Sequence, residues 1–153
     1  MTDRLRPGII LVLVILLACS ATPAFAKASL KDYFGKSADR TFFCDKTERS
    51  GGVVRATVRM VPVTAAFKQG VIKERAAAGA PTKGYEGYAY TLQVWELDCA
   101  AKTTRTVSSA DYATGNVLLE KNDWPGAKAE AIPPGSMAET LLKEVCGQGD
   151  KTL

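Results

Sequence analysis

The chain has 153 residues, of which 24% are charged and 46% hydrophobic, and its formal net charge is +4. This charge is too small to indicate a nucleic-acid-binding protein. Because the sequence contains no histidine, Ser-His-Asp catalysis, Cys-His catalysis and the common histidine-based zinc sites are excluded. An enzyme of this composition would have to work with carboxylates, lysines or tyrosines. We therefore expect no enzymatic activity, no cofactor and no bound metal.

The first 26 residues have the three parts of a secretory signal. Arg4 and Arg6 give a positive start, residues 9–18 form an apolar run, and Ala24-Phe25-Ala26 is a small-residue cleavage signal that would make Lys27 the first mature residue. Ten apolar residues reach about 15 Å as a helix, whereas a membrane core needs roughly 30 Å. The run is thus too short for a spanning helix. The processed chain keeps 18 basic and 15 acidic residues, a net charge of +3.

A second interpretation of the signal stays open. Residues 16–19, Leu-Leu-Ala-Cys, resemble the bacterial lipobox, in which the cysteine is lipidated and becomes the N-terminus. A lipid on Cys19 would be the only expected contact of this protein with a membrane. In either case we divide the rest into an N-terminal arm at residues 27–39, one domain at residues 40–147 and a tail at residues 148–153, a size that supports a single hydrophobic core.

The mature chain begins with an arm that could be a short helix or an ordered segment, followed by signals for strands. Residues 40–46 have strand composition, Ser50-Gly51-Gly52 supplies a turn, and residues 53–63 alternate, so we expect a hairpin. Pro62 indicates that this strand ends at a sheet edge or a bulge. Residues 65–78 change to helical spacing, and Gly70 weakens this prediction by about 1 kcal/mol, so we expect a short helix or an ordered loop.

Residues 85–99 are the strongest strand of the sequence. Alternation places Tyr88 and Tyr90 on one face and Trp95 and Cys99 on the other. Strands over residues 103–112 and 117–121 follow, separated by short turns, which predicts a meander of consecutive antiparallel strands.

Residues 136–146 are predicted to form the C-terminal helix. Ser136 and Glu139 have the spacing of a capping box, in which the serine accepts from the amide three residues on and the glutamate returns to the amide of the cap. The apolar stripe of the helix must be buried, and the sheet is the only large partner. The predicted fold class is therefore α+β, a small antiparallel meander of about five to six strands with a C-terminal helix on one face.

Three cysteines remain in the processed chain. Cys99 lies in phase with the apolar side of its strand and Cys146 ends the helical stripe, so we predict a Cys99–Cys146 disulfide that clamps the helix to the sheet. Two buried free thiols are the alternative. Cys44 is then a small buried hydrophobic residue, or it joins two copies as a homodimer.

Two further features admit opposite interpretations. Glu96 and Asp98 lie two residues apart on one face, which suits a cation or an acid–base pair, but a solvated strand end is the simpler interpretation. The cluster of Tyr85, Tyr88 and Tyr90 could form a recognition surface, or it could pack across strands.

One segment concentrates positive charge. Between residues 65 and 84, Lys68, Lys73, Arg75 and Lys83 stand against a single acid, a local charge of +3. Connecting segments often carry binding residues. We therefore predict that these four residues, with Tyr85 and Tyr88 beside them, contact an acidic partner, either a protein or a glycan. A solvated amphipathic connector is the alternative.

Several stretches together resemble the surface-adhesin protein E family. These are TFFCDKTERSGGVVRATVRMV, GYAYTLQVWELDC, TTRTVSSADYATGNVL and IPPGSMAETLLKEVC. The resemblance covers residues 40–146, and its most specific part is the Pro-Gly-Ser entry into a helix that ends in Val-Cys. It implies an antiparallel sheet with a disulfide-tied C-terminal helix, a place in the cell envelope, and binding to host matrix proteins. Cys44 departs from the pattern, because an aromatic residue is usual there.

We therefore expect an exported, non-catalytic binding module of the envelope, in the periplasm or on the outer surface. The alternative is a structural or assembly component of the periplasm that has no adhesin role. A carboxylate-dependent enzyme is a third hypothesis, which would require a pocket with paired carboxylates.

Overall fold

The computed structural model of the chain describes residues 32–147, so the export signal, Cys19 and Lys27 lie outside the described residues. The helical elements are α1 (Ala65–Ala77), the 3-10 turn η1 (Tyr85–Gly87) and α2 (Met137–Gly147). The strands are β1 (Asp32–Lys36), β2 (Arg40–Ser50), β3 (Val53–Pro62), β4 (Tyr88–Asp98), β5 (Thr103–Ala113), β6 (Val117–Asp123) and β7 (Glu130–Ala131).

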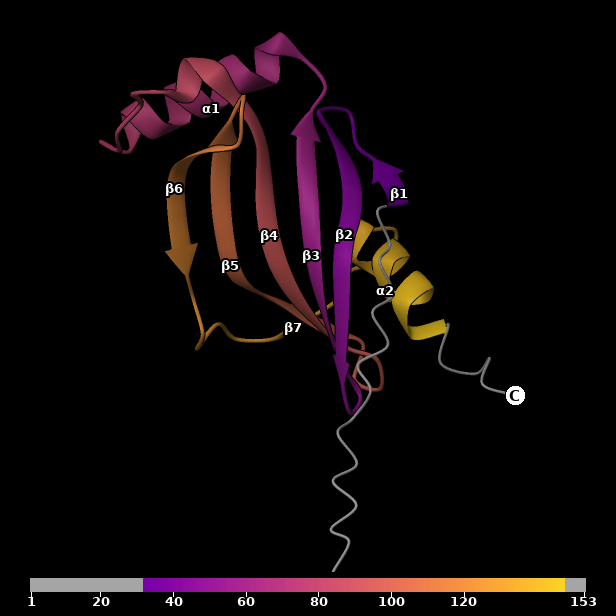
Figure 1. Cartoon of the computed structure of the whole chain (residues 1–153). Helices are drawn as coiled ribbons and strands as arrows, with labels where there is room; N and C mark the ends of the chain where they lie inside the picture. The colour runs from indigo at the N-terminus through magenta and orange to yellow at the C-terminus, as the bar shows by residue number, and fades with distance from the viewer. Residues whose placement is uncertain (1–31, 148–153) are drawn as a thin grey trace, which may run out of the picture.

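The strands form one antiparallel sheet in which β1 to β6 lie in sequence order, and β7 pairs with the free end of β5. Figure 1 shows a curved sheet with α1 across one end and α2 against one face. The predicted meander, hairpin and α+β fold class are confirmed. The tight turns are local in origin: Gly115 and Asn116 both have positive φ, a conformation that these two residue types tolerate best.

The N-terminal arm, expected as a short helix or an ordered segment, contains strand β1, which pairs with β2 through Tyr33 and Phe43. The predicted start of the long strand at residue 85 is wrong. Residues 85–87 form a 3-10 turn before β4 instead of extending it. A register irregularity between Tyr88 and Tyr90 then breaks the alternation, so Tyr88 shares a face with Thr91 and not with Tyr90. Local propensity favoured strand throughout, and the bulge is set by pairing with β5.

Helix α2 buries its apolar stripe against the sheet, as predicted. Leu141, Leu142 and Val145 pack on a core supplied mainly by β2 and β3, including Phe42, Val54, Ala56 and Val58. The cap is present in a modified form: the amide of Glu139 donates to Ser136 Oγ at 3.2 Å, while the Glu139 carboxylate accepts from the amide of Gly135 at 2.7 Å. The glutamate therefore reaches the residue before the cap and not the Ser136 amide, which bonds the Pro133 carbonyl, so this half of the predicted capping box is wrong.

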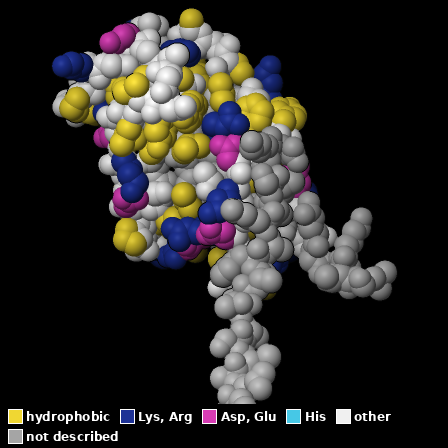
Figure 2. All heavy atoms as spheres, viewed as in Figure 1, with side chains coloured by type: hydrophobic (Ala, Val, Ile, Leu, Met, Phe, Trp, Pro, Cys, Tyr) yellow, Lys and Arg dark blue, Asp and Glu magenta, His cyan; other side chains and the backbone are white. Residues whose placement is uncertain are grey.

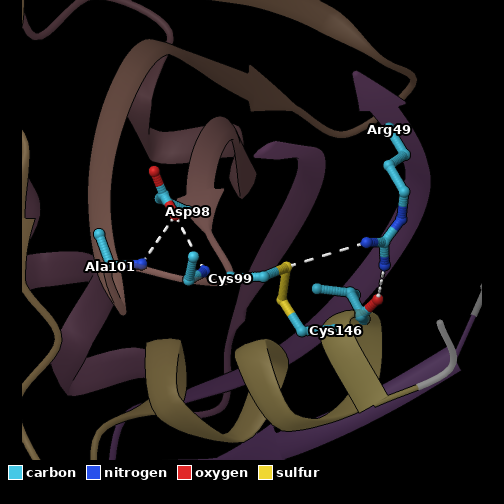
Figure 3. Close-up of a disulfide and its surroundings, with 7 residues drawn as sticks. Arg49, Asp98, Cys99, Ala101 and Cys146 are labelled. Carbon is cyan, nitrogen blue, oxygen red and sulfur yellow. Dashed lines mark hydrogen bonds between the residues drawn. A yellow bond between two sulfur atoms is a disulfide. The ribbon is translucent and has the colours of Figure 1, made fainter. Parts of the chain in front are cut away.

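The predicted disulfide joins Cys99, just after β4, to Cys146 in the last turn of α2, with Cα atoms 5.7 Å apart. Figure 3 shows Arg49 of β2 beside this bridge, with its guanidinium directed at the Val145 carbonyl and at Cys99 Sγ. A cation at the last carbonyls of a helix offsets the negative end of the helix dipole. Cys44 is a buried thiol. The C-terminal end of α2 is thus fixed covalently to β4 and electrostatically to β2.

Candidate functional site

The structure separates the six residues predicted to contact a partner into two groups. Lys73 and Lys83 are exposed and Lys68 is half-buried. Arg75, in contrast, is turned inward, and Tyr85 and Tyr88 are 2% and 3% exposed. Within this segment, only the three lysines are placed where a partner could reach their charges, and their role stays a prediction.

The inward group forms a polar network between η1 and the sheet. The Tyr85 hydroxyl lies 2.7 Å from Asp111 Oδ2, and Asp111 Oδ1 accepts from the Thr91 hydroxyl at 2.6 Å. That hydroxyl also bonds the hydroxyl of Tyr88 at 2.6 Å. The predicted tyrosine cluster therefore acts in packing and hydrogen bonding, at least at positions 85 and 88.

Arg75 connects helix α1 to this network. Its guanidinium pairs with Glu120 of β6, donates from Nε to the Pro81 carbonyl at 2.9 Å and lies 4.0 Å from the centre of the Tyr85 ring. No residue of α1 is fully buried, and these contacts, together with the Arg40 guanidinium over the Phe67 ring, help to hold the helix at the end of the sheet. Arg75 lowers the pKa of Glu120, and burial raises the pKa of Tyr85.

The predicted pair of carboxylates does not form a site. Glu96 accepts from Arg105 Nε at 2.7 Å, whereas Asp98 accepts from the amides of Ala100 and Ala101 at 2.9 Å and 2.8 Å and thereby closes the turn after β4. Among residues 32–147, no cluster of three or more carboxylate or cysteine groups could hold a metal ion.

The sheet has a second face, opposite α2, which we call the open face. The register of β2 to β6 arranges its side chains in rows across the strands, of which four concern the candidate site. From the α1 end, the rows are Tyr90, Tyr112 and Leu118; Phe43, Arg59, Leu92, Ala110 and Lys121; Lys46, Thr57, Val94, Ser108 and Asp123; and Glu48, Arg55, Glu96 and Arg105. Figure 2 shows this face, with hydrophobic side chains gathered over β4 to β6 near α1 and charged side chains at the opposite end.

The first two rows supply an apolar surface that we call the upper patch, formed by Phe43, Tyr90, Leu92, Tyr112 and Leu118. Tyr90 and Tyr112 are stacked with ring centres 5.0 Å apart, and Leu118 is 52% exposed. Beside them the Arg59 guanidinium lies 4.8 Å from the Phe43 ring centre and forms a forked ion pair with Asp45. Rigid aromatic side chains next to an oriented arginine are the composition that binding hot spots share.

A comparison with known protein families gives a match over most of the chain. The family model for surface-adhesin protein E matches residues 33–147. This chain belongs to the surface-adhesin protein E family. A search of curated proteins and a search of solved structures each gave no match.

Membership of the family, together with a disulfide of the kind that persists in oxidising compartments, fits a surface or exported protein. Among the described residues, none of the helices has the length and apolar character that crossing a membrane requires. The match begins at residue 33, within β1.

Sequence reasoning missed the open face as a candidate site. The signal was present in part, because Arg55, Thr57 and Arg59 alternate with the buried residues of β3. The polar alternation showed a solvent-facing side, but an apolar patch on that side depends on Tyr90, Tyr112 and Leu118. These come from three different strands, and a register irregularity between β5 and β6 brings Leu118 into line with the two tyrosines.

Proposed function

We propose that this protein is a non-catalytic binding module of the bacterial cell envelope that holds a protein ligand on the open face of its sheet. The observation that carries the proposal is the upper patch, an aromatic surface on the sheet face that no described helix covers. Apolar surfaces that remain exposed and contiguous on small proteins mark interaction sites. Family membership points to ligands outside the cell, and matrix proteins are the class that the family resemblance implies.

Three exposed or half-exposed lysines extend the proposed surface. Lys68, Lys73 and Lys83 lie in the segment between β3 and β4, at the end of the sheet that carries the upper patch. An acidic region of the ligand would be attracted to them. Exposed charges of this kind contribute more to the rate of association than to affinity, and salt screens them. The lysines are therefore proposed to guide the ligand, while the upper patch retains it.

A non-catalytic role is supported by the way the acidic groups of the chain are used. Asp111 and Glu120 are engaged by hydroxyl donors and by Arg75, and Glu96 is engaged by Arg105. A general acid or base needs a carboxyl group that can reach a substrate. These three are committed to holding neighbouring elements together.

The experiment is a pull-down with the processed protein against purified matrix proteins and, separately, against envelope extracts. The wild type is compared with Leu118→Lys and with the matched control Val117→Lys. The two residues are neighbours on β6, are 52% and 57% exposed, and point to opposite faces. If wild type and Val117→Lys capture a matrix protein and Leu118→Lys does not, the result supports an adhesin. A ligand found only in envelope extracts would favour the periplasmic assembly role, and retention by both variants would contradict the proposal.

A further inference from the structure

Arg55, in the fourth row of the open face, shares its nearest acids with other cations. These acids are Glu48 and Glu96, and the cations are Lys46 of the third row and Arg105 of the fourth. Glu96 is held by Arg105, with Nε to Oε2 at 2.7 Å, and Glu48 is held by Lys46. Each acid thus has a closer cation than Arg55, whose Nε is 4.0 Å from Glu96 Oε1 and whose side chain is 55% exposed.

Arg55 also separates two hollows in the surface. One, of about 170 Å³, is lined by Lys46, Glu48, Arg55, Thr57 and Val94. The other, of about 380 Å³, is lined by Arg55, Glu96, Val107, Ser108, Asp123 and Pro125. The smaller hollow has two cations against one acid, the larger has one cation against two acids. Only the smaller one is therefore suited to an anion.

We propose that the smaller hollow receives the carboxylate of an acidic side chain from the protein ligand, an inference that rests on the proposed function of the open face. A guanidinium presents paired donors that match a carboxylate, and such charge-assisted bonds are stronger than neutral ones. The Thr57 hydroxyl is an additional donor in the hollow, and Val94 offers an apolar wall for the methylene groups of the incoming side chain.

The local ion pair can yield to a ligand. The Lys46 and Glu48 side chains are 51% and 46% exposed, and exposed pairs contribute little to stability. An incoming carboxylate can therefore recruit Lys46 as well as Arg55. At a volume of about 30 Å³ for each water molecule, the hollow has room for a carboxylate and its adjoining methylene groups.

The position of the hollow also restricts the ligand. Arg55 lies three rows from Tyr90 and Tyr112, which corresponds to about 20 Å along the strands. An extended ligand segment would therefore carry its acidic residue about six positions from the apolar residue that contacts the upper patch. The ligand class is thus a protein segment with an acidic residue and an apolar anchor at that separation.

The test uses NMR titration of the processed protein with N-acetyl-glutamate methylamide, which carries one carboxylate and no other charge, and with its glutamine analogue. The glutamate probe should give saturable shifts at the Arg55 Nε–H and at the Thr57 and Val94 amides. Arg55→Gln should reduce its affinity by about tenfold or more, whereas Arg55→Lys should retain part of it. Lys121→Gln, which removes an ion-paired cation of the same face, is the matched control and should leave the affinity unchanged.

Equal shifts from the glutamine analogue, shifts spread over all exposed cations, or retention of binding in a folded Arg55→Gln variant would overturn the proposed carboxylate site. The proposed function is tested separately, because the upper patch does not contact this probe. If the probe binds at Arg55 while Leu118→Lys leaves protein capture unchanged, the carboxylate site stands and the function of the upper patch fails. If capture depends on Leu118 but the probe does not bind, the carboxylate inference fails alone.

Discussion

The hydroxyl of Tyr85 lies 2.7 Å from Asp111 Oδ2 and 3.3 Å from Glu120 Oε2, so one phenol stands between carboxylates of two neighbouring strands. The hydroxyl has a single proton, and the shorter distance assigns it to Asp111, while Arg75 satisfies Glu120. This arrangement explains why Tyr85, a candidate for a recognition surface in the sequence analysis, is buried instead. Its ring contacts Arg75 of α1, and its hydroxyl contacts β5 and β6.

Replacing Tyr85 with phenylalanine is expected to lower the free energy of unfolding by about 1–3 kcal/mol, because Asp111 loses a buried donor while the ring packing is kept. The measurement is urea unfolding at pH 7. Tyr90→Phe is the matched control, since its hydroxyl bonds Asn116 in an exposed position. Equal free energies of unfolding for Tyr85→Phe and wild type would mean that water replaces the Tyr85 hydroxyl as the donor to Asp111 without loss of stability.

The pair of Arg75 and Glu120 predicts a specific loss of stability in acid. Because Arg75 holds the pKa of Glu120 below its ordinary value of 4.5, the native state favours the ionised carboxylate. The resulting stabilisation is fully present above about pH 4.5 and disappears as the pH falls through the lower native pKa. Glu120→Gln should therefore be less stable than wild type at pH 7, and the difference should shrink as the pH is lowered below 4.5. A difference in the free energy of unfolding between the two proteins that stays constant as the pH is lowered would contradict the role of the pair.

The disulfide prediction concerns both connectivity and stability. Peptide mapping without reduction should yield a Cys99–Cys146 peptide and a Cys44 thiol that reacts only after denaturation. Cys99→Ser with Cys146→Ser should lower the free energy of unfolding by roughly 2–5 kcal/mol, because the bridge closes a loop between residues 47 apart. Any disulfide that includes Cys44 would refute this connectivity.

The N-terminus of α2 gives a smaller effect. Ser136→Ala removes the acceptor for the Glu139 amide and should destabilise the domain by roughly 0.5–2 kcal/mol. Thermal unfolding monitored by circular dichroism measures the change. Ser37→Ala, in the turn between β1 and β2, is a control for loss of a hydroxyl outside the helix. Were Ser136→Ala as stable as wild type, packing of Leu141 and Val145 alone would position α2.

The features that were predictable from the sequence are those set by local patterns. The capped helix with its apolar stripe, the hairpin turn at Gly51 and Gly52, and the phase of Cys99 each depend on a few neighbouring residues. The position of Arg75 was not predictable in this way. Its charge marked it as a surface residue, but an ion pair with Glu120, 45 positions away, draws it inward.

The predicted faces of β4 are confirmed from Tyr90 onward, and only Tyr88 was assigned to the wrong face. A period of two holds only while pairing is regular, and the irregularity between Tyr88 and Tyr90 moves Tyr88 to the face of Thr91. Tyr90 keeps its predicted phase with Leu92, and regular pairing with β5 places it against Tyr112 in the upper patch. Leu118 joins them across an irregularity between β5 and β6, which contacts between strands determine and single-strand patterns do not contain.

The most direct test of the central claim is the affinity of a matrix protein recovered in the pull-down, measured by biolayer interferometry against wild type, Leu118→Lys and Val117→Lys. The claim predicts that Leu118→Lys weakens binding by about tenfold or more, because it places a charge in the apolar contact, whereas Val117→Lys stays within about twofold of wild type. Equal affinity of all three proteins, or an equal loss in both variants, would contradict binding through the open face.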